Sequence, residues 1–104
     1  MEKYMDREGR ALDIACFLHR NYMMSRRWVT VGEYARYAGI SASPHLRGLF
    51  AELLDLCVVT VREEPYKKTV KYTFALNYDH VSEFYTQLKQ QIVNKVGTWQ
   101  EKLL

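Results

Sequence analysis

The sequence predicts a mainly helical α+β domain, and three observations lead to this fold class. Apolar residues recur at steps of three and four over residues 6–24, 44–56 and 79–96, the period of a helix lying on a core. Residues 57–62 and 69–76 instead alternate with a period of two and are rich in β-branched and aromatic residues. Glycine and proline are scarce, so each one marks a boundary between elements.

Length and composition suit one domain. A chain of 104 residues with 48% apolar residues can bury a single core without a metal or a disulfide. Cys16 and Cys57 stand in apolar surroundings, so we expect two buried free thiols. The first residues lack the apolar stretch of a signal peptide, and no segment approaches the ~18 apolar residues of a membrane span. We therefore expect a cytoplasmic protein.

The first helix is predicted from Asp6 to Met24, and a short extended piece, Trp28-Val29, follows it. Its apolar stripe comprises Ala11, Leu12, Ala15, Leu18 and Tyr22. Thr30 and Glu33 have the spacing of a capping box, in which each side chain binds the backbone N–H of the other residue. A short second helix is expected after this box, and Gly39 ends it in a left-handed conformation.

The third helix is predicted over residues 44–56. Ser43 is a favourable N-cap, and Pro44 suits the first helical position because its missing N–H is not needed there. Its expected core positions are Leu46, Leu49, Phe50, Leu53 and Leu54. The strands 57–62 and 69–76 then form a hairpin with a polar connecting turn over residues 63–68. One face of the second strand is expected to hold Val70, Tyr72, Phe74 and Leu76.

A last helix is predicted from Asp79, as N-cap, to about Val96, with Gly97 as its end. Its stripe contains Val81 and the residues Phe84, Tyr85, Leu88, Ile92 and Val96. This stripe suits two arrangements. The helix can pack on the first helix of the same chain, or it can pair with a second subunit, and the favoured expectation is a homodimer through these residues. The chain thus divides into residues 1–78 and a C-terminal helix with a tail, 79–104.

The order of elements resembles that of the winged helix-turn-helix superfamily of bacterial, archaeal and viral regulators. The resemblance covers about residues 6–76 and rests on the segments 30–41 and 46–61. It implies that helix 44–56 reads the major groove of double-stranded DNA and that the wing, residues 63–69, contacts the DNA backbone. A homodimer would place two such helices about 34 Å apart on a palindromic site.

The third helix carries residues that suit this role. Ser41, Ser43 and the first amides of the helix are expected to bind phosphate. His45 and Arg47 are long enough to reach base edges, and arginine is the usual partner of guanine. Gly48 is unfavourable inside a helix, so it indicates either close approach to DNA or close packing against another helix.

Further cations are expected at the DNA backbone. Glu63 and Glu64 oppose such contacts, because they would face the same polyanion. The residues expected to contact the backbone are Arg36 on the second helix and Arg62, Tyr66, Lys67 and Lys68 around the wing. Residues 1–78 hold 12 Lys/Arg against 9 Asp/Glu, so the excess of +3 lies in this part of the chain. An excess this small permits phosphate binding without requiring it.

No chemistry of catalysis is visible. The three histidines, His19, His45 and His80, are isolated from one another and from the cysteines, so no metal site is expected. No glycine-rich phosphate loop and no activated nucleophile is present, so neither a cofactor nor an enzyme is expected. The favoured hypothesis is a sequence-specific DNA-binding transcriptional regulator, from a virus or mobile element. The alternative is a winged helix that binds or inhibits a protein, which the weak basicity and the surface aromatic residues also suit.

Overall fold

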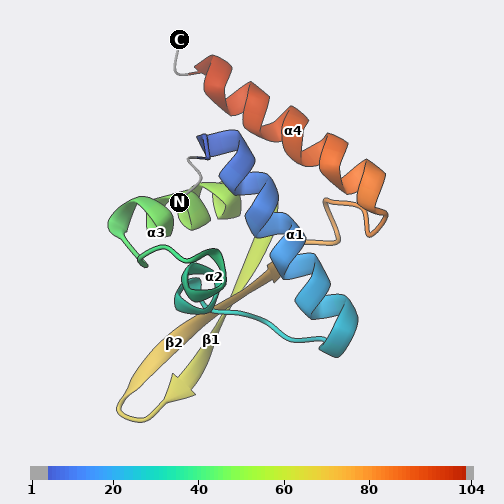
Figure 1. The fold of residues 1–104 in the computed structure, drawn as a ribbon. Helices are drawn as coiled ribbons and strands as arrows, with labels where there is room; N and C mark the ends of the chain where they lie inside the picture. Colours follow the sequence, from blue (N-terminus) through green and yellow to red (C-terminus); the bar gives the residue numbers. More distant parts are fainter. Residues whose placement is uncertain (1–4, 103–104) are drawn as a thin grey trace.

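The structure is a computed structural model that describes residues 5–102, with the side chains of residues 85 and 97–102 left out of the description. Four helices and one antiparallel hairpin follow one another (Figure 1): α1 Arg7–Ser25, α2 Val31–Ala38, α3 Pro44–Asp55, β1 Val59–Tyr66, β2 Thr69–Leu76 and α4 Tyr85–Lys102. The predicted class, a mainly helical α+β domain, is therefore confirmed.

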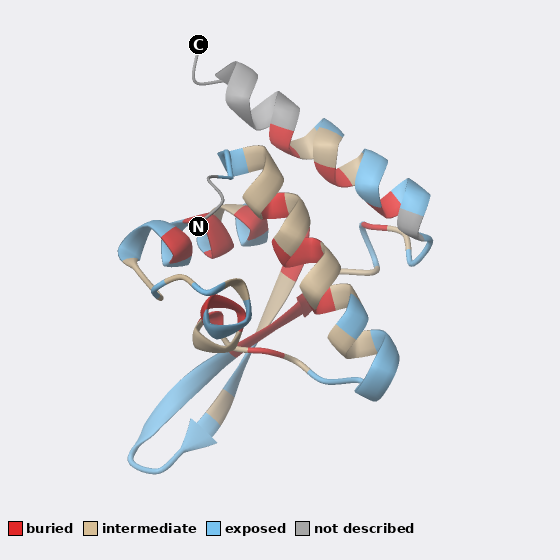
Figure 2. Cartoon of the chain, in the orientation of Figure 1, coloured by how far each residue is buried: buried red, intermediate tan, exposed pale blue. Residues whose placement is uncertain are grey.

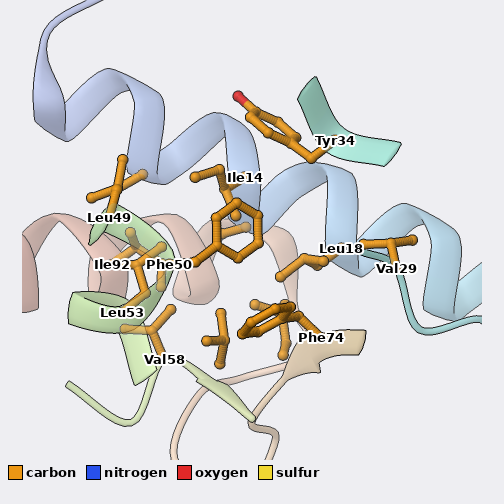
Figure 3. Close-up of a cluster of buried hydrophobic side chains, with 14 of the residues drawn as sticks. Ile14, Leu18, Val29, Tyr34, Leu49, Phe50, Leu53, Val58, Phe74 and Ile92 are labelled. Carbon is orange, nitrogen blue, oxygen red and sulfur yellow. The ribbon is translucent and has the colours of Figure 1, made fainter. Parts of the chain in front are cut away.

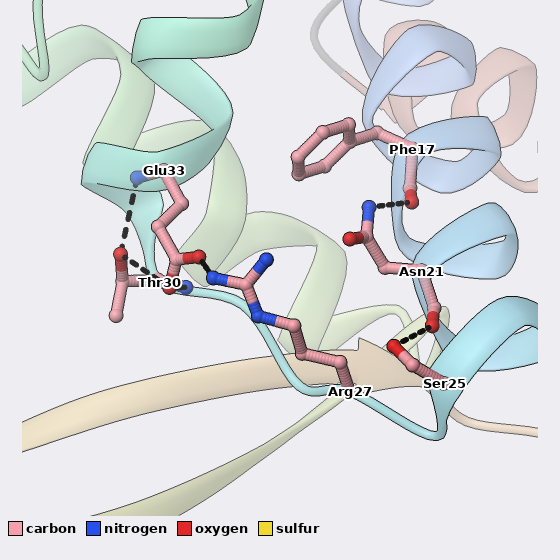
Figure 4. A network of polar contacts seen from close by, with 6 residues as sticks. All are labelled: Phe17, Asn21, Ser25, Arg27, Thr30 and Glu33. Carbon is pink, nitrogen blue, oxygen red and sulfur yellow. Dashed lines mark hydrogen bonds and ion pairs between the residues drawn. The ribbon is translucent and has the colours of Figure 1, made fainter.

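The N-terminal ends of α2 and α3 form as the sequence predicts, and Asp6, the predicted start of the first helix, is the N-cap of α1. The Asp6 carboxylate accepts a hydrogen bond of 2.7 Å from the Gly9 N–H and caps α1. At α2 the capping box is complete (Figure 4): the Glu33 N–H donates to Thr30 Oγ1 at 3.0 Å, and the Thr30 N–H donates to Glu33 Oε1 at 3.2 Å. Ser43 caps α3 by accepting from the Leu46 N–H at 3.3 Å. These bonds satisfy amides that otherwise have no partner within the helix.

Two glycines allow a matched test of backbone conformation. Gly39 ends α2 with a φ of 71°, so Gly39→Ala is expected to destabilise the fold by about 1–2 kcal/mol. Gly48 lies inside α3, and a Cβ there would meet no atom within 4 Å, so Gly48→Ala is expected to stabilise the fold by about 0.5–1 kcal/mol. Urea unfolding of both variants measures the effects. Changes of equal sign would contradict this assignment.

The core lies where α1, α3, α4 and the base of the hairpin meet (Figure 3). Phe50 is at its centre, with its ring centroid 6.0 Å from that of Tyr34 and 5.0 Å from that of Phe74. Four residues of α3 are buried as predicted, namely Leu46, Leu49, Phe50 and Leu53. The prediction for Leu54 is wrong, because 37% of this residue is exposed. It lies at the edge of the apolar stripe, one turn after the exposed Ala51 and two turns after the exposed Arg47.

The hairpin is longer than predicted. β1 begins at Val59 rather than Cys57 and continues through Tyr66, so the predicted turn 63–68 shrinks to Lys67-Lys68, with Lys67 in a left-handed conformation. Residues that look like a turn are paired instead, because their cross-strand partners suit them: Glu64 stands opposite Lys71. Pro65 is tolerated in β1 because a two-stranded hairpin keeps a free edge where no N–H is needed.

Only the base of the hairpin enters the core. Residues 73–76 of β2 are buried on both faces, and Val29 pairs with Phe74 as a short third extended segment. The outer half projects past the helices into solvent (Figure 2), so Val70 is 46% exposed and Tyr72 is 50% exposed. The two residues share a face with Phe74, as predicted. The core position that the stripe gave Tyr72 is wrong, because none of the described helices covers that part of the sheet.

The last helix begins and ends later than predicted. It starts at Tyr85 and continues past Gly97 to Lys102, with Gly97 inside the helix. Asp79 does not cap it. Instead the Asn77 side chain accepts from the Asp79 N–H at 3.3 Å, and the Asn77 carbonyl accepts from the His80 and Val81 amides. Local turns of this kind compete with a helix, so residues 77–84 form a loop.

α4 packs along α1 of the same chain (Figure 1), which is one of the two arrangements that the sequence left open. Leu88, Ile92 and Val96 are at most 1% exposed in the single chain and belong to its core. The expected dimer interface through these residues is therefore wrong, because their own chain already covers them. Phe84 is 73% exposed, and the Tyr85 side chain lies outside the described residues.

Candidate nucleic-acid interface

None of the described residues covers the outer face of α3. His45, Arg47, Gly48 and Ala51 are all exposed there. Because a Cβ on Gly48 would meet nothing within 4 Å, no described part of the chain packs closely against this glycine. Of the two explanations for Gly48, packing against another helix of the same chain is therefore not what the structure shows.

The N-terminal end of α3 adjoins that of α1. A hollow of about 710 Å³ lies between them, and Arg7, Arg10, Ser43 and His45 are among its lining residues. Sequence reasoning did not select these arginines, although their spacing of three placed them on one face of a helix. Ser41, which was selected, is exposed in the loop before α3.

Both arginines are engaged by their own chain. Arg7 forms an ion pair with Glu52, and Arg10 Nη1 donates to the Tyr34 hydroxyl at 3.2 Å. Tyr34 in turn donates to Asp13 Oδ2 at 2.7 Å, and burial raises the pKa of its phenol well above the ordinary tyrosine value. This network joins α1 to α2 and keeps Tyr34 protonated as a donor.

Arg36 and Arg27 differ in their availability. Arg36 is exposed on α2. It lines neither this hollow nor a second one, which lies between α3 and the hairpin. Arg27 forms an ion pair with Glu33, so it ties the connection between α1 and α2 to the capping box (Figure 4). Arg36 therefore stays a candidate for backbone contact, whereas Arg27 has a structural role.

The register of the hairpin gives it two different faces. Residues directly opposite one another share a face, so the cationic face holds Arg62, Glu64, Tyr66, Thr69 and Lys71. The apolar face holds Val61, Glu63, Pro65, Val70 and Tyr72. Glu63 is thus separated from the cations of the hairpin, which the sequence could not show without the register.

The cations around the cationic face are held to different degrees. The Arg62 guanidinium lies 4.4 Å from the centroid of the Trp28 ring and 3.8 Å from the Glu64 carboxylate, so this arginine is fixed. Lys67 and Lys71 lie over the Tyr66 ring at 5.5 and 5.7 Å, and neither makes an ion pair within the described residues. Lys68 is exposed at the tip beside Lys67.

The apolar face of the hairpin and the outer face of α3 enclose a second hollow of about 580 Å³, which we call the hairpin groove. Its walls are Arg47, Ala51 and Leu54 from α3 and Val61, Val70 and Tyr72 from the hairpin, over Val31 and Phe74. Lys71 also lines it. Sequence reasoning missed this groove. The alternation that places Val70 and Tyr72 on one face was visible, but the approach of this face to α3 was not.

Other features of the described residues give no evidence for a functional site. Cys16 and Cys57 are free, as expected, but half-buried rather than buried. His19 Nδ1 lies 2.7 Å from the Tyr78 hydroxyl, and burial raises the pKa of Tyr78 to about 12. No cluster of three metal-ligating side chains occurs in the part of the chain that the structure describes. None of the helices within residues 5–102 combines the length and apolar character of a membrane span.

Comparisons with models of protein families, with curated proteins and with solved structures found no match to this chain. The resemblance to the winged helix-turn-helix superfamily therefore stays a prediction. A function for the chain has to be argued from the surfaces of α3 and the hairpin.

Proposed function

We propose that this chain is a sequence-specific double-stranded DNA-binding protein, a transcriptional regulator that places α3 in the major groove. The observation that carries the proposal is the uncovered outer face of α3, which presents His45, Arg47, Gly48 and Ala51 to solvent. Beside this face a cationic hairpin projects from the body of the protein. A reading helix with an adjoining basic hairpin suits a duplex, whose bases and phosphates lie side by side.

The outer face of α3 suits the shape of the major groove. That groove is about 12 Å wide and admits one helix, provided that the side chains between helix and bases are small. Gly48 and Ala51 supply this close approach in the middle of α3. Arg47 is exposed and makes no ion pair within the described residues, so its guanidinium is available for a guanine.

The tip of the hairpin suits the phosphate backbone. Lys67, Lys68 and Lys71 are exposed, whereas Glu64 is already next to Arg62. Glu63 lies on the apolar face of the hairpin, opposite to the face that holds Arg62 and Lys71. The acidic residues that seemed to oppose a phosphate contact are therefore partly neutralised or turned away from the lysines. Backbone contacts from such lysines add affinity without sequence preference.

The decisive experiment measures binding of the purified protein to a random-sequence duplex library over a series of salt concentrations. Retained duplexes are amplified, selected again and sequenced. Binding that weakens steeply with salt and enriches one sequence supports the proposal. Absence of binding at the lowest salt concentration would refute it.

Lys67→Ala combined with Lys68→Ala is expected to weaken binding to all duplexes alike. Two phosphate contacts would be lost, so the slope of log K against log salt falls by about 2. Fluorescence anisotropy with the enriched and a scrambled duplex measures both quantities. Lys89→Ala, an exposed lysine on α4, is the matched control and should change neither. An unchanged slope in the double variant would place the hairpin tip away from DNA.

Protein binding is a second candidate function, favoured by one observation. The hairpin groove is mainly apolar, and Val70 and Tyr72 expose about half of their surface there. Large exposed apolar patches are rare on monomeric proteins, and they usually mark sites that bind a protein or a ligand. If the selection enriches no duplex, the hairpin groove favours protein binding as the function of this chain.

A further inference from the structure

An exposed apolar knob, the Phe84 side chain, lies in the loop before α4. Phe84 is 73% exposed and is the most exposed aromatic residue among those described. Its N–H donates to Ser82 Oγ at 3.0 Å, and the Ser82 N–H donates to Gln91 Oε1 at 2.6 Å, so the loop is tied to α4. Val81 is buried and anchors the same loop in the core. The backbone that presents Phe84 is therefore tied to the rest of the chain, so binding there requires less ordering of the loop.

The surroundings of this knob are acidic. Glu83 precedes Phe84 directly, Asp79 lies in the same loop, and both are exposed. Neither carboxylate makes an ion pair within the described residues. The loop therefore presents an aromatic ring together with negative charge.

The hairpin groove has the complementary properties. Its walls include the aliphatic and aromatic side chains of Leu54, Val70 and Tyr72, so a phenyl ring finds apolar surface on both sides. Arg47 and Lys71 also line it and supply positive charge without an ion-pair partner among the described residues. Phe84 of the same chain does not line this groove.

We propose that the hairpin groove of one chain receives the Phe84 side chain of a second copy, with Glu83 next to Arg47 and Lys71. Groove and knob are different surfaces, so the contact is heterologous. It continues from copy to copy unless two copies close on each other reciprocally. One ring and one charged pair bury less than the ~1,000 Å² typical of stable interfaces, so we expect weak association.

The proposal does not depend on DNA binding, although Arg47 belongs to both surfaces. A chain whose groove is filled cannot offer the same Arg47 to a base pair. Self-association and DNA binding are therefore expected to exclude one another.

Sedimentation equilibrium without DNA tests the contact. The average mass of the wild-type protein is expected to rise over about 0.05–1 mM, the range of a weak interface. Phe84→Ser and Tyr72→Ser should each remain monomeric, because one lacks the knob and the other part of the groove. An equimolar mixture should form 1:1 dimers, since the mixture contains one intact knob and one intact groove.

Controls distinguish loss of this contact from loss of folding and from a general effect of surface substitutions. Met24→Ser changes a residue that is 79% exposed and lines neither hollow, so it should associate like the wild type. Circular dichroism checks that each variant is folded. Glu83→Lys should abolish association, and a double variant that carries Glu83→Lys and Arg47→Glu in the same chain should restore part of it, because opposite charges then face each other again. A wild-type protein that stays monomeric, or a monomeric mixture of the two serine variants, would overturn the proposal.

Discussion

Phe50→Ala is expected to lower the free energy of unfolding by about 3–5 kcal/mol, the range for removing a buried aromatic ring. Phe50 is 1% exposed, and its ring packs against Tyr34 of α2 and Phe74 of β2. The variant thus leaves a cavity where α2, α3 and the base of the hairpin meet. Because a small domain is stable by only about 5–15 kcal/mol, this loss is a large share of the total.

Urea unfolding followed by circular dichroism measures this effect, and a second phenylalanine is the matched control. Phe84→Ala removes the same side chain from a position that is 73% exposed, so its effect should stay within about 0.5 kcal/mol. Losses of similar size in the two variants would show that Phe50 is not at the centre of the core.

Arg47→Ala is expected to cost about 1–3 kcal/mol of binding free energy on the enriched duplex, equivalent to roughly 5- to 150-fold in affinity. Arg47 stands on the uncovered face of α3 and has no ion-pair partner within the described residues. If it binds one guanine, the selected sequence of the variant loses its preference at that single base position. Affinity for scrambled DNA should change much less.

Anisotropy titrations and a repeated selection with the variant test this prediction. Arg20→Ala is the control, because Arg20 is exposed on α1 and lines neither hollow. Equal losses on the enriched and the scrambled duplex would make Arg47 a phosphate contact. No loss on either duplex would show that Arg47 does not contact DNA, and it would contradict the placement of α3 in the major groove.

Much of the candidate site was visible in the sequence. The exposed face of α3, with His45, Arg47 and Gly48, follows from helical spacing, because the apolar stripe determines which side chains remain outside. The alternation of β2 showed which of its residues share a face. Which residues of β1 join each face was not visible, since this depends on the register that pairs Glu64 with Lys71. Without that register, the lysines and the glutamates seemed to share one surface. The hairpin groove was missed because it depends on how the hairpin stands against α3.

The sequence by itself determined the local features of this protein. The caps at Asp6, Thr30 and Ser43 and the left-handed end at Gly39 depend on bonds between residues no more than four positions apart. Their chemistry is complete within one turn of chain, so pattern and residue type are sufficient to predict them.

Tertiary structure alone decided which apolar residues are covered. Tyr72 and Leu54 have core-like patterns, yet both are exposed. None of the described helices covers the outer half of the hairpin, where Tyr72 lies, and Leu54 lies at the edge of the apolar stripe of α3. Leu88 and Ile92 were expected to pair with a second subunit, but in the structure α4 packs on α1, a helix some 60 positions earlier in the same chain. Burial depends on which elements stack, and a periodic stripe shows which residues share a face without showing which of them another element covers.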